Sequence, residues 1–108
     1  LIANNMVSGI SGSGTGNLTT NAIVGIRIMG NTGGVSIYHN SVNLSGKIAR
    51  TGTTVCKNAS LYLASTVTAL DIRNNIFSNS ILDTTGVNTS YAIYSDAPTG
   101  SLLNINYH

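Results

Sequence analysis

The sequence predicts an all-β fold in which parallel strands stack into a solenoid, and three observations support this prediction. Branched aliphatic residues are abundant, with 12 Ile, 9 Leu and 7 Val among 108 residues, and most of them are β-branched, which favours strands. Short segments alternate apolar and polar residues with a period of two, as in 35–38 and 70–73. These segments recur at an interval of about 35 residues, which is typical of a repeat architecture.

The composition excludes several other classes of protein. Asn, Ser, Thr and Gly account for 52 of the 108 residues, but the aliphatic content is too high for a flexible linker. Only 7% of residues are charged and the net charge is +2, against about 25% charged residues in an average domain, so we expect no nucleic-acid partner. No apolar run of about 18 residues is present, so we expect no membrane insertion.

Each repeat begins with an aliphatic residue that is followed three positions later by Asn. The three asparagines are spaced by 35 and 35 residues. A second landmark follows the first Ile of each repeat by 24, 24 and 21 residues. The first ladder contains Ile2, Ile37, Ile72 and, in a repeat that has just begun, Ile105; the asparagines are Asn5, Asn40 and Asn75; the second landmark is Ile26, Leu61 and Ile93.

These intervals predict a β-helix, in which each coil pairs with the next through parallel hydrogen bonds. We expect one domain over residues 1–108, with coils at about 1–34, 35–69 and 70–101 and the start of a fourth at 102–108. The stretches 9–21, 46–58 and 79–90 hold most of the Gly, Ser and Thr residues and are predicted to be loops.

Equivalent residues of successive coils should form rows along the stack. The row of Ile2, Ile37, Ile72 and Ile105 should point inward. The asparagines should lie at sharp bends, because Asn tolerates left-handed backbone conformations and stacked amides hydrogen-bond to one another. We therefore interpret the asparagine row as structural.

The segments GNTGG (30–34), IYHNSVNLSG (37–46), ASLY (59–62), LDIRNNIF (70–77) and YAIY (91–94) resemble right-handed parallel β-helix repeats of the pectate-lyase-like superfamily. In particular, they are similar to the long-coil repeats of large secreted or surface proteins of Bacteroidetes and related bacteria. This resemblance implies a β-helical segment of a much longer chain on the exterior of a bacterial cell.

The sequence offers little for catalysis or cofactor binding. The acidic residues are Asp71, Asp83 and Asp96; they fall at different places in the repeat, so no carboxylate pair for glycoside hydrolysis or calcium binding is expected. Asp71 and Arg73 should form a solvated surface pair. The single Cys56 can form no internal disulfide. We predict no catalytic residue, no metal site and no cofactor.

Candidate contacts remain on the outer surface. Tyr38, Tyr62 and Tyr94 could stack on sugar rings or on a partner protein, although strand preference alone also accounts for tyrosine. The triplet that begins at Asp83 resembles the O-glycosylation signal of Bacteroidetes, which makes Thr84 a candidate glycan site.

Two functions from different classes follow. The first is a non-catalytic structural or adhesive segment, a stalk or fibre of an extracellular cell-surface protein. The second is a carbohydrate-binding or polysaccharide-degrading β-helix whose catalytic coils lie outside this segment. Because a three-coil slab exposes strand edges, the expected partners are adjacent coils of the same long chain or stacked identical units, with polysaccharide as a further candidate.

Overall fold

The computed structural model describes residues 1–10, 22–30, 34–48, 56–84 and 88–106, with the side chains of 103 and 106 left out. Within these ranges the chain is all-β and its strands form three parallel sheets. One 3₁₀ turn, η1 (Thr99–Ser101), is present. None of the helical structure in these ranges is long and apolar enough to cross a membrane.

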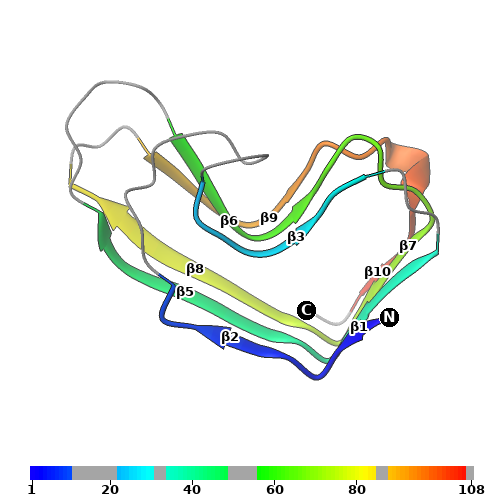
Figure 1. Cartoon of the computed structure of the whole chain (residues 1–108), viewed down its shortest axis with the longest axis horizontal. Helices are drawn as coiled ribbons and strands as arrows, with labels where there is room; N and C mark the ends of the chain where they lie inside the picture. The colour runs from blue at the N-terminus through cyan, green and yellow to red at the C-terminus, as the bar shows by residue number, and fades with distance from the viewer. Residues whose placement is uncertain (11–21, 31–33, 49–55, 85–87, 107–108) are drawn as a thin grey trace.

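The chain visits the three sheets in the same order on each pass (Figure 1). Sheet A contains β1 (Ile2–Ala3), β4 (Val35–Tyr38), β7 (Leu70–Arg73) and β10 (Leu102–Asn106). Sheet B contains β2 (Met6–Ser8), β5 (Ser41–Ile48) and β8 (Ile76–Asp83), and sheet C contains β3 (Val24–Ile28), β6 (Cys56–Leu63) and β9 (Asn88–Ser95). We call β1 to β3, β4 to β6 and β7 to β9 the first, second and third pass.

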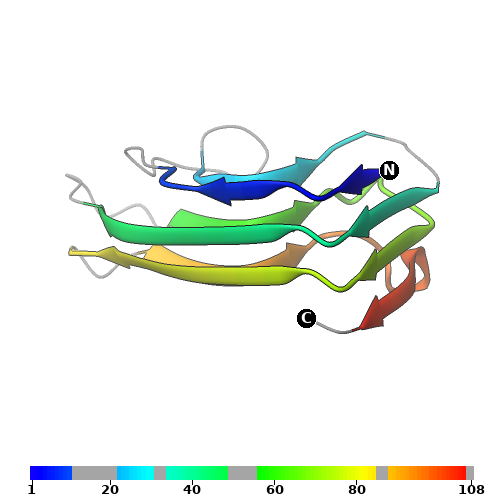
Figure 2. The same ribbon diagram turned by 90° about the horizontal axis from the view of Figure 1, so that it is seen from below.

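Strands of successive passes lie side by side in each sheet, as Figure 2 shows for β2, β5 and β8. The register joins the residues that the repeat predicted to be equivalent. In sheet A, Ile2 is opposite Ile37, Ile37 is opposite Ile72, and Ile72 is opposite Ile105. In sheet C, the register partners Ile26, Leu61 and Ile93 form a second row. In sheet B, the register partners Val7, Val42 and Phe77 form a third row.

The apolar rows pack between the sheets. Ile37 and Ile72 from sheet A and Leu61 from sheet C are fully buried in one cluster. A smaller cluster contains Val42 and Leu44 from sheet B. Ile105 is the exception to the predicted inward row, since its side chain is 45% exposed; within the described residues β10 is an outer strand of sheet A.

Strand β3 of sheet C lies in close contact with β5 of sheet B at Gly25. A Cβ atom built on Gly25 of β3 would overlap Cγ1 of Val42 in β5 and would lie 2.7 Å from the carbonyl oxygen of Ser60. The Ser60 hydroxyl, also buried, donates to the carbonyl oxygen of Ser78 in β8 at 2.7 Å. The contact between the two sheets therefore requires glycine at position 25.

The predicted loops are shorter in the structure than in the sequence analysis. β5 continues to Ile48 and β6 begins at Cys56, while β8 continues to Asp83 and β9 begins at Asn88. Ser and Asn residues that suggested loops are incorporated into strands, because pairing with the neighbouring pass supplies their backbone hydrogen bonds. The predicted loop at 9–21 lies largely outside the described residues.

Candidate functional site

The asparagine row lies at the corner between sheets A and B. Oδ1 of Asn40 accepts from the backbone N–H of Asn5 at 3.1 Å and from its Nδ2 at 2.9 Å. Oδ1 of Asn75 accepts from the same two groups of Asn40, each at 2.9 Å. Nδ2 of Asn40 also donates to the carbonyl oxygens of Ile2 and Tyr38, both at 3.0 Å. The row therefore joins the three passes through side chains as well as backbone.

The left-handed residue at this corner is one position earlier than predicted. The residues with positive φ are Asn4 (58°), His39 (54°) and Asn74 (54°), not the row asparagines themselves. The preceding residue makes the turn, and the row asparagine is thereby placed with its amide directed along the stack. Asn and His are among the residues that tolerate this conformation best.

Beside the same corner, three side chains on sheet A form a polar cluster. The hydroxyl of Tyr38 donates to Oδ2 of Asp71 at 2.6 Å. Nε of Arg73 donates to Oδ1 of Asp71 at 2.6 Å, and Nη2 donates to Oδ2. The Arg73 guanidinium carbon also lies 5.5 Å from the centre of the Tyr38 ring, within the range of a cation–π contact.

These contacts change the acidity of the cluster. The pKa of Asp71 is lowered to about 2, first by the hydrogen bond from Arg73 and then by that from Tyr38. The pKa of Arg73 is raised because its cationic form donates to Asp71. A carboxylate held in this way is ionised at neutral pH and its oxygens are already engaged, so it is poorly suited to general acid catalysis.

An open hollow of about 220 Å³ lies next to this cluster and is lined by Tyr38, His39, Arg73 and Asn74. Its lining carries an aromatic ring, a cation, an imidazole and an amide. These groups could contact a polar ligand at the surface, but the hollow is smaller than the roughly 300–1,000 Å³ of a typical small-molecule site.

The other two candidate tyrosines lie on sheet C and differ in accessibility. Tyr62 is only 1% exposed, so the structure does not present its ring for the predicted sugar or partner contact. Its hydroxyl donates to Oδ2 of Asp96 at 2.9 Å. Burial and then this hydrogen bond raise the pKa of Tyr62 to about 12. Tyr62 is better described as a packed residue, because its neighbours cover the ring.

Tyr94 is half-buried and stays nearer to the surface. Its ring makes an edge contact with Tyr91 at 4.9 Å between ring centres. Nζ of Lys57 donates to the Tyr94 hydroxyl at 2.7 Å and lies 4.5 Å from the ring centre. This hydrogen bond raises the pKa of Lys57. Lys57 thus occupies part of the ring surface that a sugar would need.

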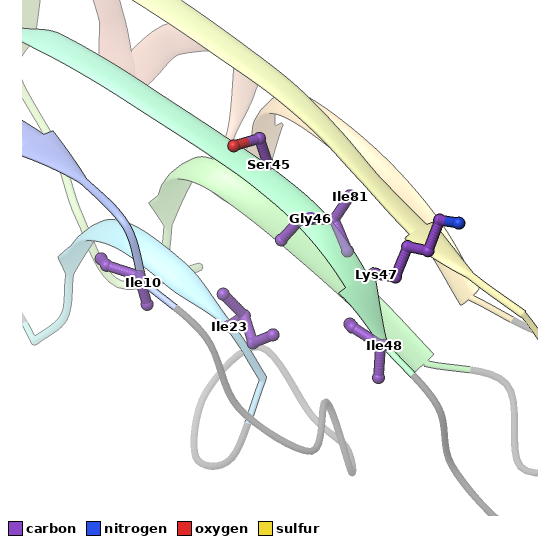
Figure 3. Close-up of a pocket in the computed structure, with 7 residues that line it drawn as sticks. All are labelled: Ile10, Ile23, Ser45, Gly46, Lys47, Ile48 and Ile81. Atoms are coloured by element: carbon purple, nitrogen blue, oxygen red, sulfur yellow. The ribbon is translucent and has the colours of Figure 1, made fainter.

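A second small cavity of about 50 Å³ lies beside the C-terminal half of β5, between that strand and the segments at Ile10 and Ile23 (Figure 3). Most of its lining is apolar, and Ser45 and Lys47 are its polar side chains. Its volume would admit water but no ligand of ordinary size. The lining residues are Ile10, Ile23, Ser45, Gly46, Lys47, Ile48 and Ile81.

Three further predicted positions can be located. Asp83, expected in a loop, is the last residue of β8 and is 7% exposed. Thr84 follows it, is exposed, and donates its hydroxyl to the carbonyl oxygen of Ile48 at 3.3 Å. Cys56 is buried. Among the described residues, no group of three His, Cys, Asp or Glu side chains could hold a metal ion.

The sequence analysis missed a group of polar contacts that involves the second and third passes. Nδ2 of Asn79 donates to Oδ1 of Asn58 and to the carbonyl oxygen of Tyr91. The hydroxyl of Ser90 donates to the carbonyl oxygen of Ile81 at 2.8 Å. A signal was present, because Asn79 occupies the register position that Leu44 holds one pass earlier.

Fold and site together define a class of all-β proteins built from parallel sheets that the chain visits in a repeating order. Comparison with protein-family models, with curated proteins and with solved structures finds no match to this chain.

Proposed function

We propose that the chain is a segment of a right-handed parallel β-helix that serves as a rigid structural or adhesive element of a bacterial cell-surface protein, without catalytic activity. One observation carries this proposal: equivalent residues are stacked in register through successive passes, with Asn5, Asn40 and Asn75 bonded to one another along the stack. Right-handed winding is the expected hand, because parallel crossover connections are right-handed in about 98% of cases.

The environment of the carboxylates supports a structural role. Asp71 is held by Arg73 and Tyr38, Asp96 accepts from Tyr62, and Asp83 is buried. The carboxylates lie on different strands or turns, whereas glycoside hydrolysis uses two that flank one bond. Neutral side chains dominate the outer positions, which suits a stack in which like charges would repel.

The proposal is tested in cells of the source organism with an antibody against this chain. We expect labelling of intact cells, loss of labelling after brief external proteolysis, and an antigen much larger than 11.2 kDa that contains further repeats. Labelling that requires permeabilised cells would contradict the surface location. A crystal structure with left-handed winding would contradict the fold.

Carbohydrate binding is the second candidate, and the hollow beside Tyr38 and Arg73 favours it. Affinity electrophoresis through gels that contain neutral or acidic polysaccharides would test it. Retardation of the native chain that disappears in Tyr38→Ala, but persists in Tyr94→Ala, would place binding at this hollow. Equal mobility in every gel would contradict carbohydrate binding, and the structural role would then be the only one of the two candidates left.

A further inference from the structure

Buried polar atoms without a partner lie close together between sheets B and C. Nδ2 of Asn58 and both polar side-chain atoms of Asn88 are buried, and no hydrogen bond reaches them in the described part of the chain. Asn58 itself is only 1% exposed. Buried polar groups of native proteins are normally bonded to protein or to ordered water, so these atoms indicate a bound small molecule.

The orientation of the Asn58 amide is fixed by its neighbours. Oδ1 of Asn79 accepts from the backbone N–H of Ile81, and Nδ2 of Asn79 donates to the carbonyl oxygen of Tyr91. A backbone N–H only donates and a carbonyl only accepts, so the amide of Asn79 cannot be reversed. Nδ2 of Asn79 also donates to Oδ1 of Asn58. Nδ2 of Asn58 is therefore directed elsewhere in the interior, where it needs an acceptor.

Asn88 lies beside Asn58 on the neighbouring strand. The register of sheet C pairs Asn58 with Ser90 and Asn88 with Cys56. The two asparagines are thus two positions apart on adjacent strands and share one face of the sheet. Ser90, on the same face, donates its hydroxyl to the carbonyl oxygen of Ile81 in β8. This face is therefore the one that is turned toward sheet B.

The separation of the two amides suits one bridging water molecule. Adjacent strands lie about 4.8 Å apart and two residues span about 6.6 Å, which places the two Cβ atoms about 8 Å apart. A water that accepts one hydrogen bond and donates another joins polar atoms about 4.5–6 Å apart. That distance is left when each side chain extends part of the way toward the other. Water also matches the chemistry, because the N–H of Asn58 needs an acceptor and the carbonyl of Asn88 needs a donor.

The second pass is less polar at the corresponding positions. Leu44 occupies the register position of Asn79, and Cys56 occupies that of Asn88. The polar site therefore belongs to the contact between the second and third passes. It is distinct from the cavity of about 50 Å³ beside β5, whose lining includes neither Asn58 nor Asn88 (Figure 3).

We propose that Asn58 and Asn88 bind an ordered water molecule in the interior between the second and third passes. The water accepts from Nδ2 of Asn58 and donates to Oδ1 of Asn88. It supplies hydrogen bonds that no described residue provides to these atoms. Through Asn58 and Asn79, the water is connected to sheet B as well as to sheet C. The site depends on these buried amides and not on an extracellular location.

A cation is the other small species that a buried amide oxygen attracts. Asp83 adds a buried carboxylate to the inward face of β8, two positions beyond Ile81. The Nδ2 groups of Asn58 and Asn88 favour water over a cation, because their hydrogens repel a positive charge and require an acceptor.

Water–protein cross-relaxation NMR on the native full chain tests the site without any substitution. We expect the side-chain amide hydrogens of Asn58 to show cross-peaks with water that have the sign of a long-lived contact. The exposed side-chain amide of Asn43 is the matched control and should show only the sign of rapidly exchanging surface water. The absence of a cross-peak for Asn58, or the same sign for both residues, would overturn the proposal.

Magnetic relaxation dispersion of the water oxygen nucleus counts long-lived internal waters and excludes relay through the hydroxyl of Ser90. Asn88→Leu removes both polar atoms of its side chain, so we expect the dispersion amplitude to fall by the contribution of at least one water. Asn43→Leu makes the same replacement at an exposed position and should leave the amplitude unchanged. Equal amplitudes for the native chain and Asn88→Leu would overturn the proposal. If Asn88→Leu does not fold, the cross-peaks of the native chain decide.

Titration with calcium chloride, and separately with sodium chloride, distinguishes water from a cation. We expect the side-chain amide shifts of Asn58 and Asn88 to match those of the exposed Asn43 in showing no saturable change. A saturable change confined to Asn58 and Asn88 would assign the site to a cation and overturn the proposal.

Discussion

Replacing Asn40 with alanine should remove the central link of the asparagine row. The side chain of Asn40 accepts two hydrogen bonds from Asn5, and the two hydrogens of its Nδ2 are shared among three acceptors, on Ile2, Tyr38 and Asn75. Each such bond contributes about 1 kcal/mol net, and a buried group left without a partner costs about 1–3 kcal/mol.

The expected loss is smaller than the sum of these hydrogen bonds. Asn5 is exposed, so water can replace its partner, while Asn40 itself is only 2% exposed. We therefore expect Asn40→Ala to lower the free energy of unfolding by about 3–4 kcal/mol, a large part of the roughly 5–15 kcal/mol that stabilises a typical domain. Asn5→Ala, at an exposed position of the row, should cost about 1 kcal/mol.

Urea unfolding followed by circular dichroism measures these differences, and an unchanged m-value keeps the comparison valid. Asn43→Ala is the matched control, because Asn43 is an exposed asparagine of β5, the strand that begins directly after Asn40, and its replacement should change stability by less than about 0.5 kcal/mol. A loss for Asn40→Ala no larger than that of the control would refute the structural interpretation of the row.

Three more predictions follow from the geometry. Gly25→Ala should destabilise the chain by about 1–3 kcal/mol, because its methyl group would overlap the neighbouring sheet, whereas Gly100→Ala meets open space and should leave the melting temperature nearly unchanged. The carboxyl of Asp71 should titrate near pH 2 by NMR, and its contribution to stability, present above pH 4, should fade as the pH drops toward 2. Arg73→Gln should raise the midpoint of the Asp71 titration. An unchanged midpoint would contradict the hydrogen bond from Arg73 as the cause of the low pKa. Tyr62 should ionise near pH 12, so its stabilising contribution is complete below pH 10 and is lost as the pH rises through 12. The absorbance of tyrosinate, measured against pH for the native chain and for Tyr62→Phe, checks this. A native chain that ionises one tyrosine more than Tyr62→Phe already near pH 10 would contradict the prediction.

The parts of the fold that depend on the repeat could be predicted from the sequence. The interval of 35 residues places Ile2, Ile37 and Ile72 in one row, and they are register partners in sheet A. A residue interval carries this information because parallel stacking aligns residues one repeat apart. Strand ends were harder to predict, because Asn58 and Asn79 suggest loops locally but are paired by a neighbouring pass.

The details of the candidate site depended on three-dimensional contacts that no interval encodes. The burial of Tyr62 results from the packing of neighbouring side chains on sheet C, including Tyr94, whose ring centre lies 6.3 Å away. The left-handed turn falls on His39 and not on Asn40, because the amide of Asn40 must lie along the stack.

The unequal spacing of the rows has a consequence for how such a chain can evolve. From the second pass to the third, the sheet B and corner positions keep the interval of 35 residues, from Asn40 to Asn75, while Leu61 and Ile93 in sheet C are 32 residues apart. The difference arises between β8 and β9, away from the corner. Insertions and deletions are thus tolerated on one side of the repeat, and at the corner only a whole repeat can be gained or lost without displacing the asparagines. Selection can then change the number of repeats separately from the segments that connect sheet B to sheet C. The length of the stack and the surface formed by those segments can therefore diverge independently.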